Sequence, residues 1–432
     1  MATIGAGQGI KDRLPQALGL IGLGITLWGG AALILRWGQY PGLSVVTGLG
    51  LIATAVLLWL RSRPADRLLV EPSTWSLQQD PETYRLQAQF VARNLNPLLE
   101  VTLAWVEPRL HLLSKGSTGE IRSRVTVRSA HTDMDPRPDN YWQAYIISPQ
   151  SSTALEVEIE LWGQDLSLLQ TCWLELDYVQ YGRQQRTPKT AHLIAPLQQQ
   201  DPLTDPQWRQ QGSTQVLPIP THLLTPSDDW GQVLERYVLP HVQPGDIVAI
   251  SETAAAVVQG NFRHPTDVKL SGLARTLCYL FPSKTSLSSA YGMQVLIDSS
   301  SPWRVTTALI LGLLCKLVGI RGVFYALAGE QAALIDDVTG TLPPYDQFLV
   351  LGPQNPQQIT DQLQGKTGQS VAIVDANDLG GVKILALSPD SESTSSSEVI
   401  VAALKRNPAG NSAEQTPIVL IRPKSPSSQP EA

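Results

Sequence analysis

The sequence lacks a surplus of basic residues. Its 432 residues include 32 lysines and arginines against 38 aspartates and glutamates, so the formal net charge is -6, and only 16% of the residues are charged. A protein that holds nucleic acid needs a basic surface to neutralise phosphates. We therefore exclude nucleic acid as a partner.

Cysteine is also scarce, and no two cysteines form a CxxC pair. The three cysteines are Cys172, Cys278 and Cys315. Their scatter argues against a disulfide framework and against a zinc site, and it fits a reducing compartment. The histidines His222, His241 and His264 stand singly near prolines or apolar residues, which favours structural roles over catalytic ones.

Charge is missing altogether from two long runs near the start, Leu14 to Leu35 and Trp37 to Leu60. As a helix, each run is long enough to cross a hydrocarbon core of about 30 Å, which takes roughly 20 residues. A cleaved signal peptide is the alternative for the first run, but a second run of full length follows within a few residues. We predict a tail over residues 1–13 and a transmembrane helical hairpin over residues 14–60.

Basic residues flank this predicted hairpin on both sides. The flanking residues are Lys11, Arg13, Arg61, Arg63 and Arg67, whereas only Arg36 lies between the runs. The positive-inside rule then places both ends in the cytoplasm. We expect a multi-pass integral membrane protein whose soluble body lies on the cytoplasmic side.

Residues 68–196 alternate between polar and apolar side chains. Tyr84 to Phe90 and Leu155 to Leu161 each place apolar residues on one face and polar residues on the other. Several short alternating strands, separated by Asn, Pro and Gly turns, predict a β-sandwich. We interpret its glutamates as the solvated face of a sheet, and the domain as a structural or docking module.

A polar segment, residues 197–215, follows the sandwich and is interpreted as a surface linker because it lacks apolar periodicity. Residues 216–422 then combine short apolar runs such as Ile247 to Ile250 with a helix start at Thr225 to Asp229. This rhythm predicts a mixed α/β domain, followed by a disordered tail over residues 423–432. The chain as a whole is expected to be of the α+β class.

One apolar run of this domain, Val305 to Ala328, is interrupted by Lys316 and Arg321. A third membrane span would bury two cations, each costing about 2.5–3.5 kcal/mol at a helix centre. The run therefore predicts a core helix followed by a strand at Gly322 to Tyr325, with contact to a membrane surface as the alternative.

Two strand-like runs of the C-terminal domain end in acidic residues. Ser370 to Val374 precedes Asp375, and Ala332 to Ile335 precedes Asp336. A carboxylate just past a buried strand lies at the rim of the sheet, and two such carboxylates can share Mg²⁺ or Mn²⁺. The alternative is that Asp375 and its neighbours only shape a turn or cap a helix.

The order of these motifs resembles the γ-glutamyl ligase family of deazaflavin coenzyme biosynthesis, and in particular a membrane-anchored branch of it. The resemblance covers Val216 to Arg422, with a poorly matched insertion between Arg263 and Gly329. The motifs that carry it are Pro218-Ile219-Pro220-Thr221, the Asp228-Asp229 helix start, Gly245 to Ser251, Gln259-Gly260, the turn at Asp336, Gly352 to Pro356, and Val371 to Asp375.

The resemblance implies an enzyme that joins glutamate to a phosphorylated coenzyme precursor through an amide bond, with GTP and a divalent metal. It implies that Asp336 and Asp375 hold Mg²⁺ or Mn²⁺. The nucleotide site implied by the resemblance and by the end of the Ile247 strand comprises Ile219, Pro220, Thr221, His222, Leu223, Ser251 and Glu252. The catalytic residues are not identified.

Three positions depart from the family pattern. Val257 stands in place of a lysine, Gln259 in place of a glutamate, and Asn377-Asp378-Leu379 in place of an Asn-Gly-Arg turn. The lost lysine and arginine would have stabilised a transferring phosphoryl group. We therefore keep two hypotheses, a ligase that binds a nucleotide and a small-molecule substrate, and an inactive homologue that serves as a binding or assembly factor for membrane complexes. A homodimer is compatible with both.

Overall fold

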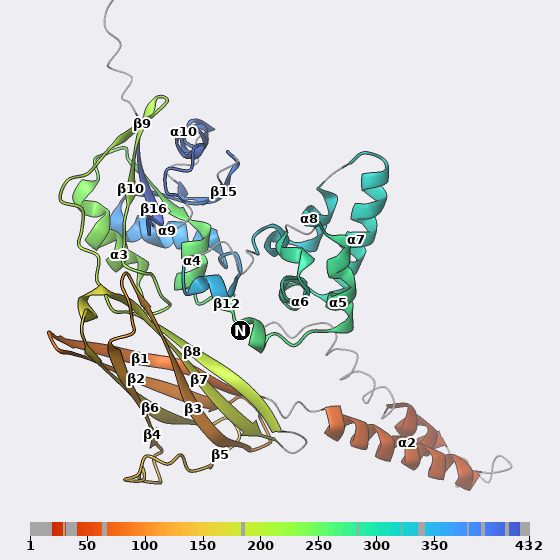
Figure 1. The fold of residues 1–432 in the computed structure, drawn as a ribbon. Coiled ribbons are helices and arrows are strands. Elements are labelled where there is room, and N and C mark those ends of the chain that lie inside the picture. The colour runs from red at the N-terminus through yellow and green to blue at the C-terminus, as the bar shows by residue number, and fades with distance from the viewer. Residues whose placement is uncertain are drawn as a thin grey trace, which may run out of the picture.

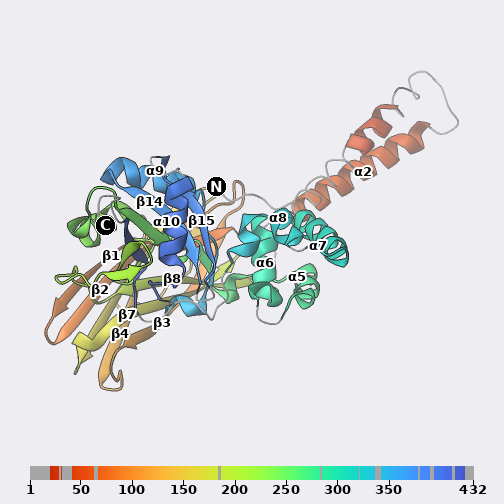
Figure 2. The same ribbon diagram turned by 90° about the horizontal axis from the view of Figure 1, so that it is seen from above.

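The computed structural model describes residues 20–28, 31, 41–62, 67–182, 186–282, 285–320, 322–335, 342–377, 380–389, 394–410 and 414–423. Figures 1 and 2 show a β-sandwich, a mixed sheet with its helices, and a group of helices beside that sheet.

The sandwich consists of two four-stranded antiparallel sheets, ordered β1-β2-β6-β4 and β5-β3-β7-β8. The strands are β1 (Leu68–Asp80), β2 (Thr83–Asn94), β3 (Val101–Ser114), β4 (Ile121–Ala130), β5 (Tyr145–Ile147), β6 (Ser152–Gly163), β7 (Leu169–Tyr181) and β8 (Arg186–Pro196), with a short 3-10 helix, η1 (Leu166–Leu168). This is the sandwich that the alternation of residues predicted.

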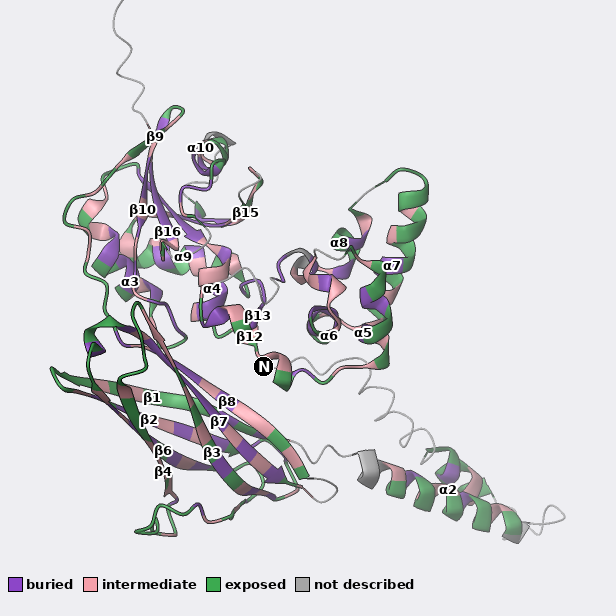
Figure 3. Cartoon of the chain, viewed as in Figure 1, coloured by how far each residue is buried: buried purple, intermediate pink, exposed green. Residues whose placement is uncertain are grey.

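Alternation along β2 and β6 produces the sandwich core. Leu86 and Phe90 are buried, as is Ile159 on β6, while Arg85 on the opposite face forms ion pairs with Glu158 and Glu160. Figure 3 shows the resulting change between buried and exposed residues along the strands. A period of two places every second side chain on the same face, so the apolar residues of both sheets meet in one core.

The C-terminal mixed sheet has the strand order β15-β14-β11-β16-β10-β9. Only β11 and β14 pair in parallel among the described strands. The strands are β9 (Arg209–Gln211), β10 (Thr214–Ile219), β11 (Ile247–Ser251), β14 (Ser370–Ala376), β15 (Val382–Leu387) and β16 (Ile418–Pro423), and a separate pair is formed by β12 (Phe262–Arg263) and β13 (Leu349–Val350).

Helices cover both faces of this sheet. One face packs against α3 (Trp230–Tyr237), α4 (Glu252–Val258) and α9 (Pro356–Thr367), and the other packs against α10 (Thr394–Leu404). Short 3-10 helices are η2 (Leu239–His241), η3 (Pro265–Asp267) and η7 (Tyr345–Gln347). Because both faces are covered, the central strands are apolar throughout, as the Ile247 to Ile250 run predicted.

A separate helical group lies between β12 and β13 in the sequence. It consists of α5 (Gly272–Leu277), η4 (Cys278–Leu280), η5 (Ser286–Ser288), α6 (Ala290–Ser299), α7 (Pro302–Leu317), α8 (Val323–Ala328) and η6 (Glu330–Ala333). The strand predicted at Gly322 to Tyr325 is wrong, because Val323 to Ala328 is helical. Within α7 only Val305, Ala308 and Leu309 are buried, whereas Leu317 is 84% exposed.

The structure contradicts the predicted transmembrane hairpin over residues 14–60. The described residues of the first run, 20–28 and 31, are helical. The second run contains α2 (Pro41–Ser62). Within the described ranges, no helix combines the length and the apolar character that a membrane crossing requires.

Three other expectations depended on the hairpin and are contradicted with it. They are the integral membrane partner, the multi-pass localisation and the cytoplasmic placement of the body. The absence of charge permits a membrane span, but it does not require one.

Candidate functional site

Four strand ends meet at one edge of the mixed sheet. Ser251 of β11 and Val374 of β14 are register partners in the parallel pair, so these strands end together. The amino end of β16 lies at the same edge, because the Ser251 N–H donates to the Pro417 carbonyl over 2.9 Å. Ile219 at the end of β10 pairs with Ile418. Ligands in open α/β sheets bind at such carboxyl ends.

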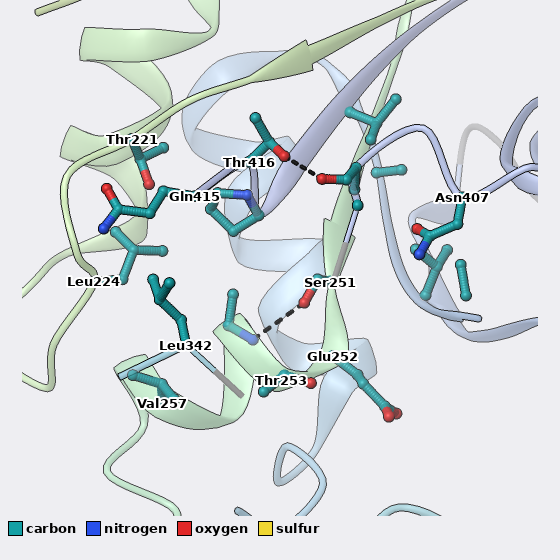
Figure 4. A pocket seen from close by; sticks show the side chains of 18 of the residues that line it. Thr221, Leu224, Ser251, Glu252, Thr253, Val257, Leu342, Asn407, Gln415 and Thr416 are labelled. Carbon is teal, nitrogen blue, oxygen red and sulfur yellow. Dashed lines mark hydrogen bonds between the residues drawn. The ribbon is translucent and has the colours of Figure 1, made fainter. Parts of the chain in front are cut away.

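A cavity of about 870 Å³ opens at this edge. Its walls come from the segment after β10, the start of α4, the ends of β14 and α10, and the segment before β16. Figure 4 shows Ser251 and Thr253 between Thr221 and Gln415 on one side and Asn407 on the other. The predicted residues that line it are Thr221, His222, Leu223, Ser251, Glu252 and Asp375.

His222 is fixed by two hydrogen bonds rather than being free to reach a ligand. Its Nε2 lies 2.8 Å from Asp228 Oδ1, and its Nδ1 lies 2.9 Å from the Tyr237 hydroxyl, which donates in turn to the Gln200 carbonyl. Burial opposes ionisation of Asp228, but the hydrogen bonds from His222 and Thr225 outweigh it and hold the Asp228 pKa below its ordinary value. This network positions the cavity wall that His222 belongs to.

The segment after β10 is also held by its backbone. The Thr221 N–H donates to the Gln415 carbonyl over 3.0 Å, and the Thr221 hydroxyl donates to the His222 carbonyl. Ile219 is buried in the core of the mixed sheet and does not line the cavity, nor does Pro220. Of the predicted segment Ile219 to Leu223, the structure therefore brings only Thr221, His222 and Leu223 to the cavity.

Ser251 and Glu252 lie where β11 turns into α4. The Ser251 hydroxyl accepts a hydrogen bond from the Ala254 N–H over 3.3 Å and caps the helix, a common role for serine. Glu252 is buried at the cavity wall. Thr253, which was not among the predicted site residues, follows directly and lines the cavity as well.

Asp375 lies near the end of β14, opposite Lys383 of β15. Burial raises the pKa of Asp375, and the charge of Lys383 only partly offsets that rise. The Asn377 side chain accepts a hydrogen bond from the Gly381 N–H over 3.0 Å, so for Asn377 the turn interpretation is correct. Asp375 itself lines the cavity, while Asp378 lies outside the described residues.

Asp336, the second predicted metal ligand, also lies outside the described residues. The strand predicted before it is wrong, because Glu330 to Ala333 is a 3-10 helix and Ile335 packs in the helical group. A run of four apolar residues fits a buried helical segment as well as a buried strand, and periodicity cannot distinguish them.

The described lining contains no lysine or arginine. Val257, at the position of the family lysine, is buried. Gln259 makes two hydrogen bonds to Gln354, one from its Nε2 to the carbonyl and one from the Gln354 N–H to its Oε1, so it joins α4 to the loop before α9. The described lining of the cavity therefore contains hydroxyl and amide oxygens, together with two acidic side chains, Glu252 and Asp375.

The other cavity residues that the sequence did not indicate come from the segment before β16 and from the end of α10. They include Asn407, Gln415 and Thr416. The Thr416 hydroxyl donates to the Ala409 carbonyl, which closes this corner (Figure 4). The only local signal was the Thr-Pro pair before the apolar run Ile418 to Ile421.

The sandwich, which packs beside the mixed sheet, has a recognisable counterpart. Residues 69–199 match the N-terminal Ig-like domain of F420-0:gamma-glutamyl ligase. The matched residues run from the second residue of β1 to beyond the end of β8, so we refer to the sandwich as the Ig-like domain. The match ends before β9, and it therefore does not extend to the cavity.

Solved structures resemble the chain only weakly. A yeast GGA1 GAE domain has 12% identity and a TM-score of 0.19, with 31% of this chain and 95% of that chain covered. A protein from Archaeoglobus fulgidus has 7% identity and a TM-score of 0.18, with 29% and 95% covered. So weak a likeness carries no implication for function. No curated protein matches the chain.

Proposed function

We propose that the protein is a γ-glutamyl-ligase-like enzyme that binds a nucleotide and a divalent metal in the cavity and joins glutamate to a phosphorylated acceptor. The observation that carries this proposal is the position of the cavity. It lies at the carboxyl ends of β11 and β14, with Asp375 at its wall, in a chain whose other domain matches the ligase Ig-like domain.

The residues at the wall fit a hard cation. Mg²⁺ and Mn²⁺ take oxygen ligands, usually one or two carboxylates together with water and substrate phosphates. Asp375 and Glu252 are the carboxylates of the described lining, and Thr253 adds a hydroxyl. Asp375 would hold the cation, whose positive charge would offset the negative charge of the nucleotide phosphates.

The residues of the chain hold the cavity wall in place and exclude water from the reacting groups. His222, fixed by Asp228 and Tyr237, holds the Thr221 to Leu223 wall in place. Leu223, Leu342 and Val257 make part of the lining apolar, which suits the flat face of a base and keeps water from the reacting groups. GTP is the nucleotide that the family resemblance implies.

The second candidate function is a nucleotide- or ligand-binding factor without catalysis. The absence of lysine and arginine from the described lining favours it, because phosphoryl transfer relies on preorganised positive charge. Both candidates require ligand binding in the cavity, and only the first requires product formation.

A paired binding and product assay tests the proposal on the full chain. Calorimetric titration with GTP and with ATP is run with and without Mn²⁺, and glutamate incorporation into phosphorylated acceptors is followed by mass spectrometry. We expect metal-dependent GTP binding and an amide product. Asp375→Asn should abolish both, whereas Asp361→Asn on α9, outside the cavity lining, should preserve both.

Binding without any product would leave the second candidate as the function. The absence of nucleotide binding by the folded wild-type protein, with and without Mn²⁺, would contradict both candidates.

A further inference from the structure

Three potential metal ligands come together where the Ig-like domain packs against the C-terminal residues. Glu175 on β7, His192 on β8 and His264 before η3 each offer a ligand atom, and these atoms all lie within 4.8 Å of one another. Figure 1 shows β7 and β8 on the side of the sandwich that faces the rest of the chain. The cluster is separate from the Asp375 cavity, whose lining includes none of the three.

The register of the sheet explains why two of the proposed ligands, Glu175 and His192, lie side by side. Glu175 and His192 are direct partners across β7 and β8, so their side chains project from the same face as near neighbours. The neighbouring Leu174 and Leu176 point into the sandwich core, which directs Glu175 to the outside of the sandwich, and contact with the C-terminal residues then buries it. His264 completes the cluster from the opposite side.

His192 carries the observation that points to a ligand. Its side chain is only 9% exposed, and within the part of the chain that the structure describes its Nε2 atom is buried and has no hydrogen-bond partner. A buried ring nitrogen in this state costs free energy unless a proton donor, an acceptor or a metal satisfies it. Asp267 Oδ2 lies 3.6 Å from this Nε2, too far for a hydrogen bond, and so offers a further oxygen.

We propose that Glu175, His192 and His264 form a binding site for a zinc-class divalent cation, which joins the Ig-like domain to the C-terminal residues. Two imidazoles and one carboxylate are a ligand set that Zn²⁺ uses, with the fourth position open to water or to Asp267. Bonds of about 2.0–2.2 Å place tetrahedral ligands roughly 3.3 Å apart, so the ligand atoms must approach one another by about 1.5 Å at most.

The surroundings of the cluster orient its ligands. The Thr266 N–H donates to His264 Nδ1 over 3.4 Å, and the Thr266 hydroxyl lies 2.7 Å from the same atom, so these contacts fix the orientation of the ring. The rings of Trp173 and Phe348 pack against both histidines and restrict access of water.

Arg109 and His111 compete with the cation for Glu175. Their side-chain nitrogens lie 3.2 and 3.1 Å from Glu175 Oε2. Both residues are about half exposed, and Arg109 also forms two hydrogen bonds with Asp177, so they can shift towards solvent when a cation takes the carboxylate. A structural ion-pair network without metal is therefore the alternative that an experiment must exclude.

Calorimetric titration of the chelator-treated full chain with Zn²⁺ alone tests the site. We expect saturable binding that weakens on the order of a hundredfold or more in His192→Gln and in His264→Gln. His241→Gln, a histidine outside the cluster, is the matched control and should bind like wild type. Asp375→Asn should also retain this site, so failure of the nucleotide proposal leaves this result unaffected.

Circular dichroism establishes that each variant is folded. If a histidine variant is not, Co²⁺ added to the wild-type protein gives the second measurement, because histidine-ligated Co²⁺ absorbs visible light more strongly than aqueous Co²⁺. Visible bands that Zn²⁺ displaces would support the site. No saturable Zn²⁺ binding by wild type, no such bands, or equal affinity in the folded cluster and control variants would overturn it.

Discussion

Ser251 of β11 and Val374 of β14 are register partners in the parallel pair of the mixed sheet. Glu252 and Asp375 follow them by one residue, so two acidic residues far apart in sequence reach the same cavity. This relationship gives the C-terminal domain a site whose chemistry the sequence only suggested.

The first prediction concerns the carboxylate that fixes His222. Asp228→Asn should lower the free energy of unfolding by about 2 kcal/mol at pH 7, because hydrogen bonds to a charged acceptor contribute about 1.5–3 kcal/mol each and asparagine keeps only part of them. Asp228 accepts from the Thr225 N–H, the Thr225 hydroxyl and His222. Urea unfolding of the variant and of Asp229→Asn, its exposed neighbour, measures the difference.

The stability contributed by the Asp228 carboxylate should depend on pH. The pKa of Asp228 is lower in the folded protein than its ordinary value of 3.8, so its contribution is present above about pH 4 and is lost as the pH falls through the folded pKa. The stability difference between wild type and Asp228→Asn should therefore shrink in urea titrations below pH 4. A difference that stays constant from pH 7 to pH 3 would assign the effect to packing instead.

A buried ion pair holds the end of β16. Arg422 donates from Nε and Nη2 to the two carboxylate oxygens of Asp246, over 2.9 and 2.8 Å, and its guanidinium lies 4.0 Å from the ring centre of Trp208. The Asp246 side chain is 1% exposed. Arg422→Ala should therefore cost about 3–5 kcal/mol, because it leaves a buried charge without its partner.

Thermal unfolding of both single variants and of the double variant checks this prediction. The double variant Asp246→Ala with Arg422→Ala should be less destabilised than the sum of the single variants. Additive effects would mean that the two residues act separately.

Limited proteolysis distinguishes the sequence interpretation of residues 197–215 from the structure. Composition predicts an exposed linker that is cut early, but Gln199 accepts a hydrogen bond from Arg236, Gln200 accepts from Tyr237, and β9 pairs with β10. We expect this segment to resist cleavage in the folded chain, because a protease needs locally unfolded backbone. Early cleavage between residues 197 and 208, mapped by mass spectrometry, would contradict the structure.

The sequence predicts individual strands and helices better than it predicts which elements pack against them. β2, β6, β11 and β14 follow from a period of two or from buried apolar runs, which are local properties. The run at Ala332 to Ile335 has the same local character but lies in a helical group, so its partners decided its conformation. The polar composition of residues 197–208 likewise did not reveal the contacts that hold them.

The sites depend on tertiary register, which a single sequence does not display. Thr221 and Asp375 could be indicated because they lie beside strand ends, whereas Gln415 and Asn407 reach the cavity only through the placement of β16 and α10. His264 looked structural in isolation. Its proximity to Glu175 and His192 arises from the packing of two domains.

The central claim is that Asp375 belongs to a metal-dependent nucleotide site. The most direct test is the melting temperature of wild type and Asp375→Asn, each with and without Mn²⁺. We predict that Mn²⁺ stabilises wild type by linkage and has little effect on the variant, which without metal melts at the same temperature as wild type or slightly higher, because a desolvated carboxylate has been neutralised. Equal destabilisation by the substitution with and without Mn²⁺ would contradict the metal site and leave Asp375 as a structural residue of the turn.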